Sequence, residues 1–183
     1  MSNAVLALER QRFLATLEIV WREGQHLLYS RQRLFVAPID TQWVIDLESH
    51  PEIAERLEAF VSRYSRMQDS IGEKLLPRWL RAQGERSTTL IDTLNRAEKL
   101  GILKSAEQWI MARQLRNSLI HEYMIDPAEF AQAINLAGSG IVELIGVYNA
   151  LLQQTKDELK LNTDMQILPY SGLPASINGA RLD

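Results

Sequence analysis

The chain has 183 residues, of which 46% are hydrophobic and 23% charged, and a formal net charge of −3, a size and composition typical of one globular domain. The absence of cysteine excludes disulfide bonds and thiolate metal sites, and it fits a cytoplasmic location. No run of about 18 apolar residues is present, and charged Glu9 and Arg10 stand where a signal peptide would be apolar, so we expect neither a membrane span nor a secretory leader.

The first half of the chain predicts helices. Apolar residues recur at helical spacing over residues 3–29, which predicts the first long helix. Residues 31–38 read as a connector, and Asp40 is a candidate cap for a short helix. Pro51 is expected in the first turn of a long amphipathic helix, which Pro77 should kink or end.

The second half predicts three more helices. Ser87 is expected to cap the first, and Gly101 to end it. The next spans residues 105–123, and the last begins at Pro127 and runs to about residue 160. The small residues Gly138-Ser139-Gly140 indicate either a bend in this last helix or the close approach of another helix.

The pattern contains no convincing strand, no internal repeat and no Gly-rich phosphate loop. Long helices joined by short connections predict an all-α bundle of four to five antiparallel helices. We assign residues 1–161 to this bundle and expect residues 162–183, which are rich in proline and glycine, to form a loose, irregular tail.

One arginine falls on the apolar face of the helix over 105–123. Ser105 is its expected N-cap, with Gln108 three residues later. The 3-4-3-4 stripe that follows the apolar positions includes Arg116 and Tyr123. A charge on such a stripe costs several kcal/mol unless it is paired or faces a polar cavity, so a structural salt bridge from Arg116 to Asp69 or Asp92 is one explanation.

A histidine lies five residues beyond this arginine. At 100° per residue, His121 is about 140° around the helix from Arg116, so the two side chains cannot share one face. Asn117 is the residue that shares a face with His121. The two can act together only by long reach, by unwinding of the last turn, or across a symmetric interface, and a two-fold dimer would let His121 of one chain meet Arg116 of its partner.

The stretch that carries these residues is Arg116-Asn117-Ser118-Leu119-Ile120-His121-Glu122-Tyr123. Its Arg-x4-His-x-Tyr pattern resembles the signature of the HEPN superfamily, and most closely its HepT-like toxin branch. The stretches at 63–75 and 90–101 also resemble helices of these proteins, in the same order. The resemblance covers roughly residues 5–155, and it implies the same helical-bundle fold.

The resemblance implies a ribonuclease that needs no metal and no cofactor. His121 would be its general acid/base, and Arg116 would stabilise charge on the scissile phosphate, roles that suit an imidazole and a guanidinium. Asn117 and Tyr123 would support these groups or position the nucleotide. Gln68 and Asp69 would line the same cavity, or they would simply form a polar helix face.

The resemblance also implies partners. They are a second copy of the chain, RNA, and a nucleotidyltransferase antitoxin that would modify Tyr123. Residues 61–116 hold 11 Lys+Arg and 6 Asp+Glu, a balance of +5, which fits either a phosphate-binding surface or a solvated helix face. Two other readings remain open: a non-catalytic HEPN module that binds nucleotide or a nucleotidyltransferase, and a helical interaction protein whose Arg116–His121 cluster is structural.

Overall fold

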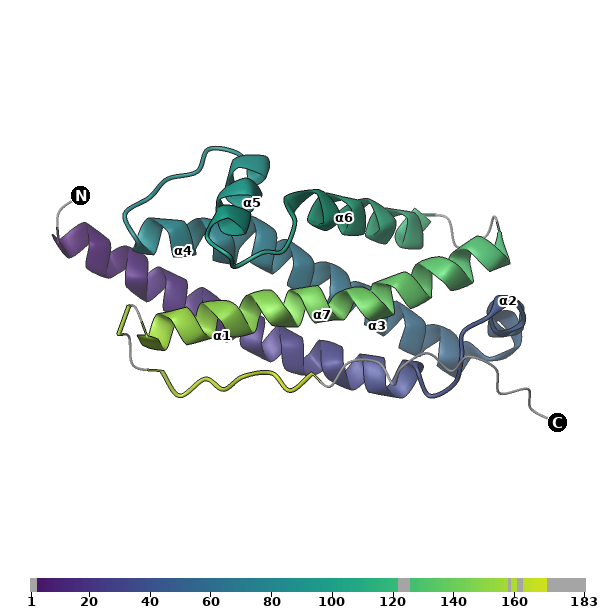
Figure 1. Ribbon diagram of the computed structural model, residues 1–183. Coiled ribbons are helices and arrows are strands. Elements are labelled where there is room, and N and C mark those ends of the chain that lie inside the picture. Colours follow the sequence, from purple (N-terminus) through teal and green to yellow (C-terminus); the bar gives the residue numbers. More distant parts are fainter. Residues whose placement is uncertain (1–2, 122–125, 158, 161–162, 171–183) are drawn as a thin grey trace.

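The computed structural model describes residues 3–121, 126–157, 159–160 and 163–170. Within these ranges every regular element is a helix, and no strand is present (Figure 1). The expected all-α class is therefore confirmed.

The chain begins with the long helix α1, Asn3–Leu34. The connector predicted from residue 31 is wrong in its first part, because the helix continues until Leu34, whose side chain is buried in the core. The short helix α2, Thr41–Ile45, follows, and Asp40 caps it as predicted by accepting a hydrogen bond from the backbone of Trp43. A 3₁₀ turn, η1 (Asp46–Ser49), leads into the next helix.

Three consecutive helical elements then continue one another across the molecule without a break. Helix α3, Pro51–Asp69, begins at the predicted proline. It passes into a π-helical turn, η2 (Ser70–Leu75), and then into α4, Leu76–Ala82. Pro77 lies in the first turn of α4 and does not end the path. Proline lacks an N–H and crowds the carbonyl four residues back, and the wider hydrogen-bonded loop of the preceding π turn relieves this crowding.

The last three helices are α5, Leu90–Lys99, α6, Ala106–His121, and α7, Pro127–Asp157. The cap of α5 differs from the prediction, because Thr89 replaces Ser87 in that role. Thr89 and Asp92 form a reciprocal capping box, in which each side chain accepts from the other's backbone N–H. Gly101 follows α5 with φ of 73°, as expected for a glycine beyond a helix end.

The three longest helices, α1, α3 and α7, form the centre of the bundle, and α5 and α6 cover one side of it (Figure 1). Helix α7 is continuous through Gly138-Ser139-Gly140. The ring of Phe35 lies against Gly138, and the phenol oxygen of Tyr64 lies 2.8 Å from where a Cβ on Gly140 would be. Of the two explanations for these small residues, close approach therefore holds.

Helix α7 is also long and apolar enough to cross a membrane, with a mean hydropathy of 1.4 over its best window, half of which is buried inside the bundle. Core helices of soluble proteins meet the same criterion. The absence of a membrane span thus stays a prediction.

Residues 163–170 form a packed extended segment where a loose tail was expected. Leu168 is only 2% exposed. The side chain of Asn149 binds the backbone of Leu168 twice, accepting from its N–H at 2.8 Å and donating to its carbonyl at 3.1 Å. Tyr148 donates to the carbonyl of Gln166 at 2.9 Å. The segment therefore belongs to the folded unit, and the rest of the predicted tail lies outside the described residues.

One half-buried carboxylate should make stability depend on pH. Glu23 accepts a hydrogen bond from Ser70 at 3.1 Å, while its Oε2 is buried and has no partner among the described residues. Burial raises the pKa of Glu23, and the Ser70 hydrogen bond and the charges of Arg66 and Lys74 oppose that rise. The folded state therefore holds the proton more tightly than the unfolded state does.

We expect Glu23→Gln to increase the free energy of unfolding at pH 7, because the neutral amide avoids the cost of burying a charge. Stability of the wild type should fall as pH rises from the ordinary glutamate pKa, about 4.3, through the raised value. The advantage of the variant should vanish below that window, where both states of the wild type are protonated. Urea unfolding between pH 4 and pH 8 measures this, and a variant less stable than wild type at pH 7 would contradict it.

Candidate functional site

Arg116 lies where the helical stripe predicted, on the inner face of α6. Its neighbours on that stripe, Trp109 and Leu119, are buried, and Arg116 itself is 7% exposed. The helix begins beside Ser105, whose hydroxyl accepts the backbone N–H of Gln108 at 3.1 Å, as the predicted N-cap requires. The arginine is thus held in the packed interface between α6 and α3.

The charge of Arg116 is paired with Asp69, the last residue of α3. Its Nη1 donates to Asp69 Oδ2 at 2.6 Å, whereas Asp92 serves the cap of α5. Of the two salt-bridge partners proposed from sequence, Asp69 is therefore the one that the fold supplies. The Nε of Arg116 is buried and has no partner in the parts of the chain that the structure describes. One donor of the guanidinium thus remains unused.

A second arginine, Arg113, joins this network and was not singled out from the sequence. It pairs with Glu73 at 2.5 Å and approaches Asp69 at 3.9 Å. The available signal was its position three residues before Arg116, which places both on the side of α6 that meets α3. Two cations face two carboxylates here, so the local charge is balanced. Glu73 belongs to the π turn η2, an element found frequently at functional sites.

Gln68 is 1% exposed, and neither atom of its side-chain amide has a hydrogen-bond partner within the described ranges. An unpaired buried amide costs about 1–3 kcal/mol. Sequence reasoning placed Gln68 and Asp69 in one cavity with Arg116. The structure brings Asp69 to Arg116 and shows no hydrogen bond between Gln68 and Arg116. Gln68 directly precedes Asp69 in the sequence, and its side-chain amide is free to form hydrogen bonds that the described structure does not use.

Tyr64 is a further polar residue at this interface that the sequence reading treated only as core. Burial raises the pKa of Tyr64 to about 12, the charge of Glu143 adds to the rise, and the charge of Arg116 opposes it. The phenol is therefore protonated at neutral pH and available as a donor. Gly140 of α7 provides the space for its oxygen. Its spacing of four residues from Gln68 on α3 was the signal that could have identified it.

The remaining predicted residues lie at the end of α6. Asn117 is exposed. His121 is the last residue of α6, and its side chain lies outside the described part, as does Tyr123. The relation of the His121 imidazole to the Arg116 guanidinium therefore remains a prediction.

An open groove of about 570 Å³ lies beside the C-terminal part of α6. Its walls come from α3, α6 and the start of α7, and most of its surface is apolar. It is lined by Leu57, Glu58, Val61, Ser62, Ser65, Leu119 and Phe130.

No cluster of three or more His, Asp or Glu side chains able to hold a metal occurs in the described ranges. The fold and this site define the chain as an all-helical bundle in which a buried arginine belongs to a partly exposed arginine–carboxylate network. No protein-family model, no curated protein sequence and no solved structure matches the chain.

Proposed function

We propose that this protein is a metal-independent endoribonuclease of the HEPN superfamily and its HepT-like toxin branch. The observation that carries the proposal is the state of Arg116. It is almost fully buried, its Nε has no partner in the described structure, and it lies on the helix whose last residue is His121. A guanidinium with an unused donor suits the binding of a phosphate oxygen, provided that local opening between α6 and α3 exposes that donor.

The proposed reaction is an internal transfer at phosphorus. The ribose 2′ oxygen forms a bond to phosphorus while the bond to the 5′ oxygen breaks, and the 2′ proton is removed as the leaving oxygen gains one. His121 carries out the proton transfers, because an imidazole titrates near neutral pH. Arg116 stabilises the charge on the phosphoryl oxygens, and Asp69 holds Arg116 in place. Gln68, Asn117 and Tyr123 position the nucleotide.

The proposed assembly is a cytoplasmic homodimer. A two-fold axis would bring His121 of one chain to Arg116 of the other, which would overcome their separation of about 140° on one helix. A nucleotidyltransferase antitoxin would silence the enzyme by modifying Tyr123. The added nucleotide would place negative charge and bulk where the RNA phosphate has to bind.

One observation favours an alternative, a non-catalytic HEPN module that binds nucleotide or a nucleotidyltransferase. Arg113 and Arg116 already face Asp69 and Glu73, so the described network carries no excess positive charge. An RNA phosphate would therefore compete with Asp69 for Arg116.

The test is an RNA cleavage assay in EDTA with purified wild type, Arg116→Ala and His121→Ala. We expect each substitution to lower the cleavage rate by about 100-fold or more, as loss of a general acid/base or of a charge-stabilising donor does. Arg86→Ala is the matched control, because Arg86 is an exposed arginine in the loop before α5. Circular dichroism should show the same helicity in all four proteins.

Mass spectrometry must first show that Tyr123 is unmodified. Unmodified wild type that cleaves none of a broad set of RNAs would overturn the nuclease proposal in favour of the alternative. Growth arrest on expression, relieved by His121→Ala, would support the nuclease.

A further inference from the structure

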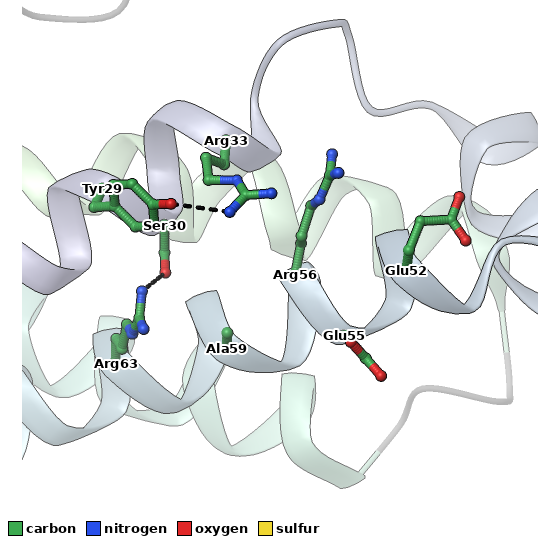
Figure 2. Close-up of a pocket in the computed structure, with 8 residues that line it drawn as sticks. All are labelled: Tyr29, Ser30, Arg33, Glu52, Glu55, Arg56, Ala59 and Arg63. Atoms are coloured by element: carbon green, nitrogen blue, oxygen red, sulfur yellow. Dashed lines mark hydrogen bonds between the residues drawn. The ribbon is translucent and has the colours of Figure 1, made fainter.

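A second site lies between the end of α1 and residues 52–63 of α3, and none of its lining residues belongs to the Arg116 network. It is a pocket of about 280 Å³ (Figure 2). Three arginines and two glutamates are among the residues around it. The full lining is Tyr29, Ser30, Arg33, Glu52, Glu55, Arg56, Ala59 and Arg63.

Two of the arginines are held in place by neutral groups. Arg63 donates from Nη1 to the hydroxyl of Ser30 and to the carbonyl of His26, the latter at 3.2 Å. Arg33 donates to the phenol oxygen of Tyr29 at 2.9 Å, and its guanidinium lies 5.5 Å from the centre of that ring. These partners fix the side chains and leave their positive charges uncompensated.

The third arginine, Arg56, makes no hydrogen bond and no ion pair with the described residues. None of the three arginines pairs with a carboxylate there. Figure 2 shows Glu52 and Glu55 pointing away from the guanidinium groups. The three guanidinium groups therefore face the pocket without a carboxylate partner, and Glu52 lies at its edge beyond Arg56.

The helix dipole accounts for only part of this arrangement. Arg33 lies in the last turn of α1, where a cation interacts favourably with the helix C-terminus. Arg56 and Arg63 lie inside α3, beyond the first and last turns in which that effect acts. Like charges repel one another, so the three arginines are complementary to an anion.

We propose that this pocket binds a small sugar phosphate monoester. Guanidinium groups bind phosphate oxygens through paired hydrogen bonds, and Glu52, which lies on the same side of α3 as Arg56 (Figure 2), would accept a hydrogen bond from a sugar hydroxyl. The volume is just below the range of about 300–1,000 Å³ usual for ligand pockets, which suits one phosphate and one sugar ring. The proposal does not depend on whether the chain cleaves RNA.

Isothermal titration calorimetry at low ionic strength tests the proposal with ribose 5-phosphate, inorganic phosphate and ribose. We expect ribose 5-phosphate to bind most tightly, inorganic phosphate more weakly, and ribose not at all. Adenosine 5′-monophosphate contains the same ribose 5-phosphate group. Tighter binding of this compound would identify a nucleotide as the source of the sugar phosphate, and tighter binding of ribose 5-phosphate would identify a free sugar phosphate.

Arg56→Gln should weaken the binding of ribose 5-phosphate about tenfold or more, the effect of one charge-assisted hydrogen bond. Arg56 has no partner to lose, so the fold should be unaffected. Arg86→Gln is the control, since Arg86 also makes no hydrogen bond or ion pair with the described residues and belongs to the loop between α4 and α5. That loop lies at the opposite end of the bundle from the end of α1 (Figure 1). Glu52→Gln should weaken the binding of ribose 5-phosphate more than the binding of inorganic phosphate.

Three results would overturn the proposal. The first is no saturable binding of ribose 5-phosphate to the wild type. The second is an equal loss of affinity in Arg56→Gln and Arg86→Gln, which would indicate nonspecific attraction to net charge. The third is equal affinity for inorganic phosphate and ribose 5-phosphate, which would remove the role of the sugar.

Discussion

Replacing Leu168 with alanine should lower the free energy of unfolding by about 2–4 kcal/mol, the usual cost of truncating a leucine in a packed core. Leu168 is 2% exposed although it lies after the last helix. Its methyl group occupies the space above Gly24 of α1, where the side chains of Met67 and Ile145 also meet. The truncation would therefore leave a cavity at the centre of the bundle.

The adjacent residue provides the matched control. Ile167 is 64% exposed, and Ile167→Ala should change stability by no more than about 0.5 kcal/mol. Asn149→Ala should act in the same direction as Leu168→Ala, because it removes both hydrogen bonds to the Leu168 backbone. Urea unfolding followed by circular dichroism measures all three variants. Equal stability of Leu168→Ala and Ile167→Ala would show that residues 163–170 are not docked in solution.

Replacing Gly138 with leucine should destabilise the protein by about 2–3 kcal/mol, a typical cost of overpacking. A Cβ at this position would lie 2.7 Å from Cε1 of Phe35 and closer still to the end of that ring. The ring cannot move away without losing its edge-to-face contact with Phe60, at a centroid distance of 5.2 Å. Either the helices separate or Phe35 leaves the core.

For a second glycine of α7, we expect the same substitution to raise stability. Gly146 is exposed, and a Cβ there would meet no atom within 4 Å. Gly146→Leu should therefore stabilise the protein by about 0.5–1 kcal/mol, because leucine favours the helix more than glycine does. Thermal unfolding of Gly138→Leu and Gly146→Leu tests whether the first substitution lowers stability and the second raises it. A Gly138→Leu variant as stable as Gly146→Leu would refute the close approach of Phe35 to α7.

Local chemistry was sufficient to place many helix ends. Asp40, Ser105 and Gly101 act where they were expected, because a cap or a glycine in a left-handed conformation is decided by a few neighbouring residues. The periodicity of apolar residues likewise put Arg116 on the inner face of α6. The sequence narrowed the partner of Arg116 to two carboxylates, and the fold selected Asp69.

The features that sequence reasoning missed depend on distant residues. Arg33 and Arg63 form one pocket although 30 positions separate them, and no local pattern reveals their meeting. Arg113 acquires its role only because the π turn η2 places Glu73 beside it. Such sites arise from helix packing, so they become visible only when the positions of the helices are known.

The sequence by itself determined the all-helical class, most helix starts and the position of Arg116, since these follow from short-range hydrogen bonding and from the 3.6-residue period. The tertiary structure alone decided the extension of α1 to Leu34 and the path through Pro77. It also decided the docking of residues 163–170, which the composition of the segment had suggested would be loose. In each of these cases burial against distant helices outweighed the local preference of the chain.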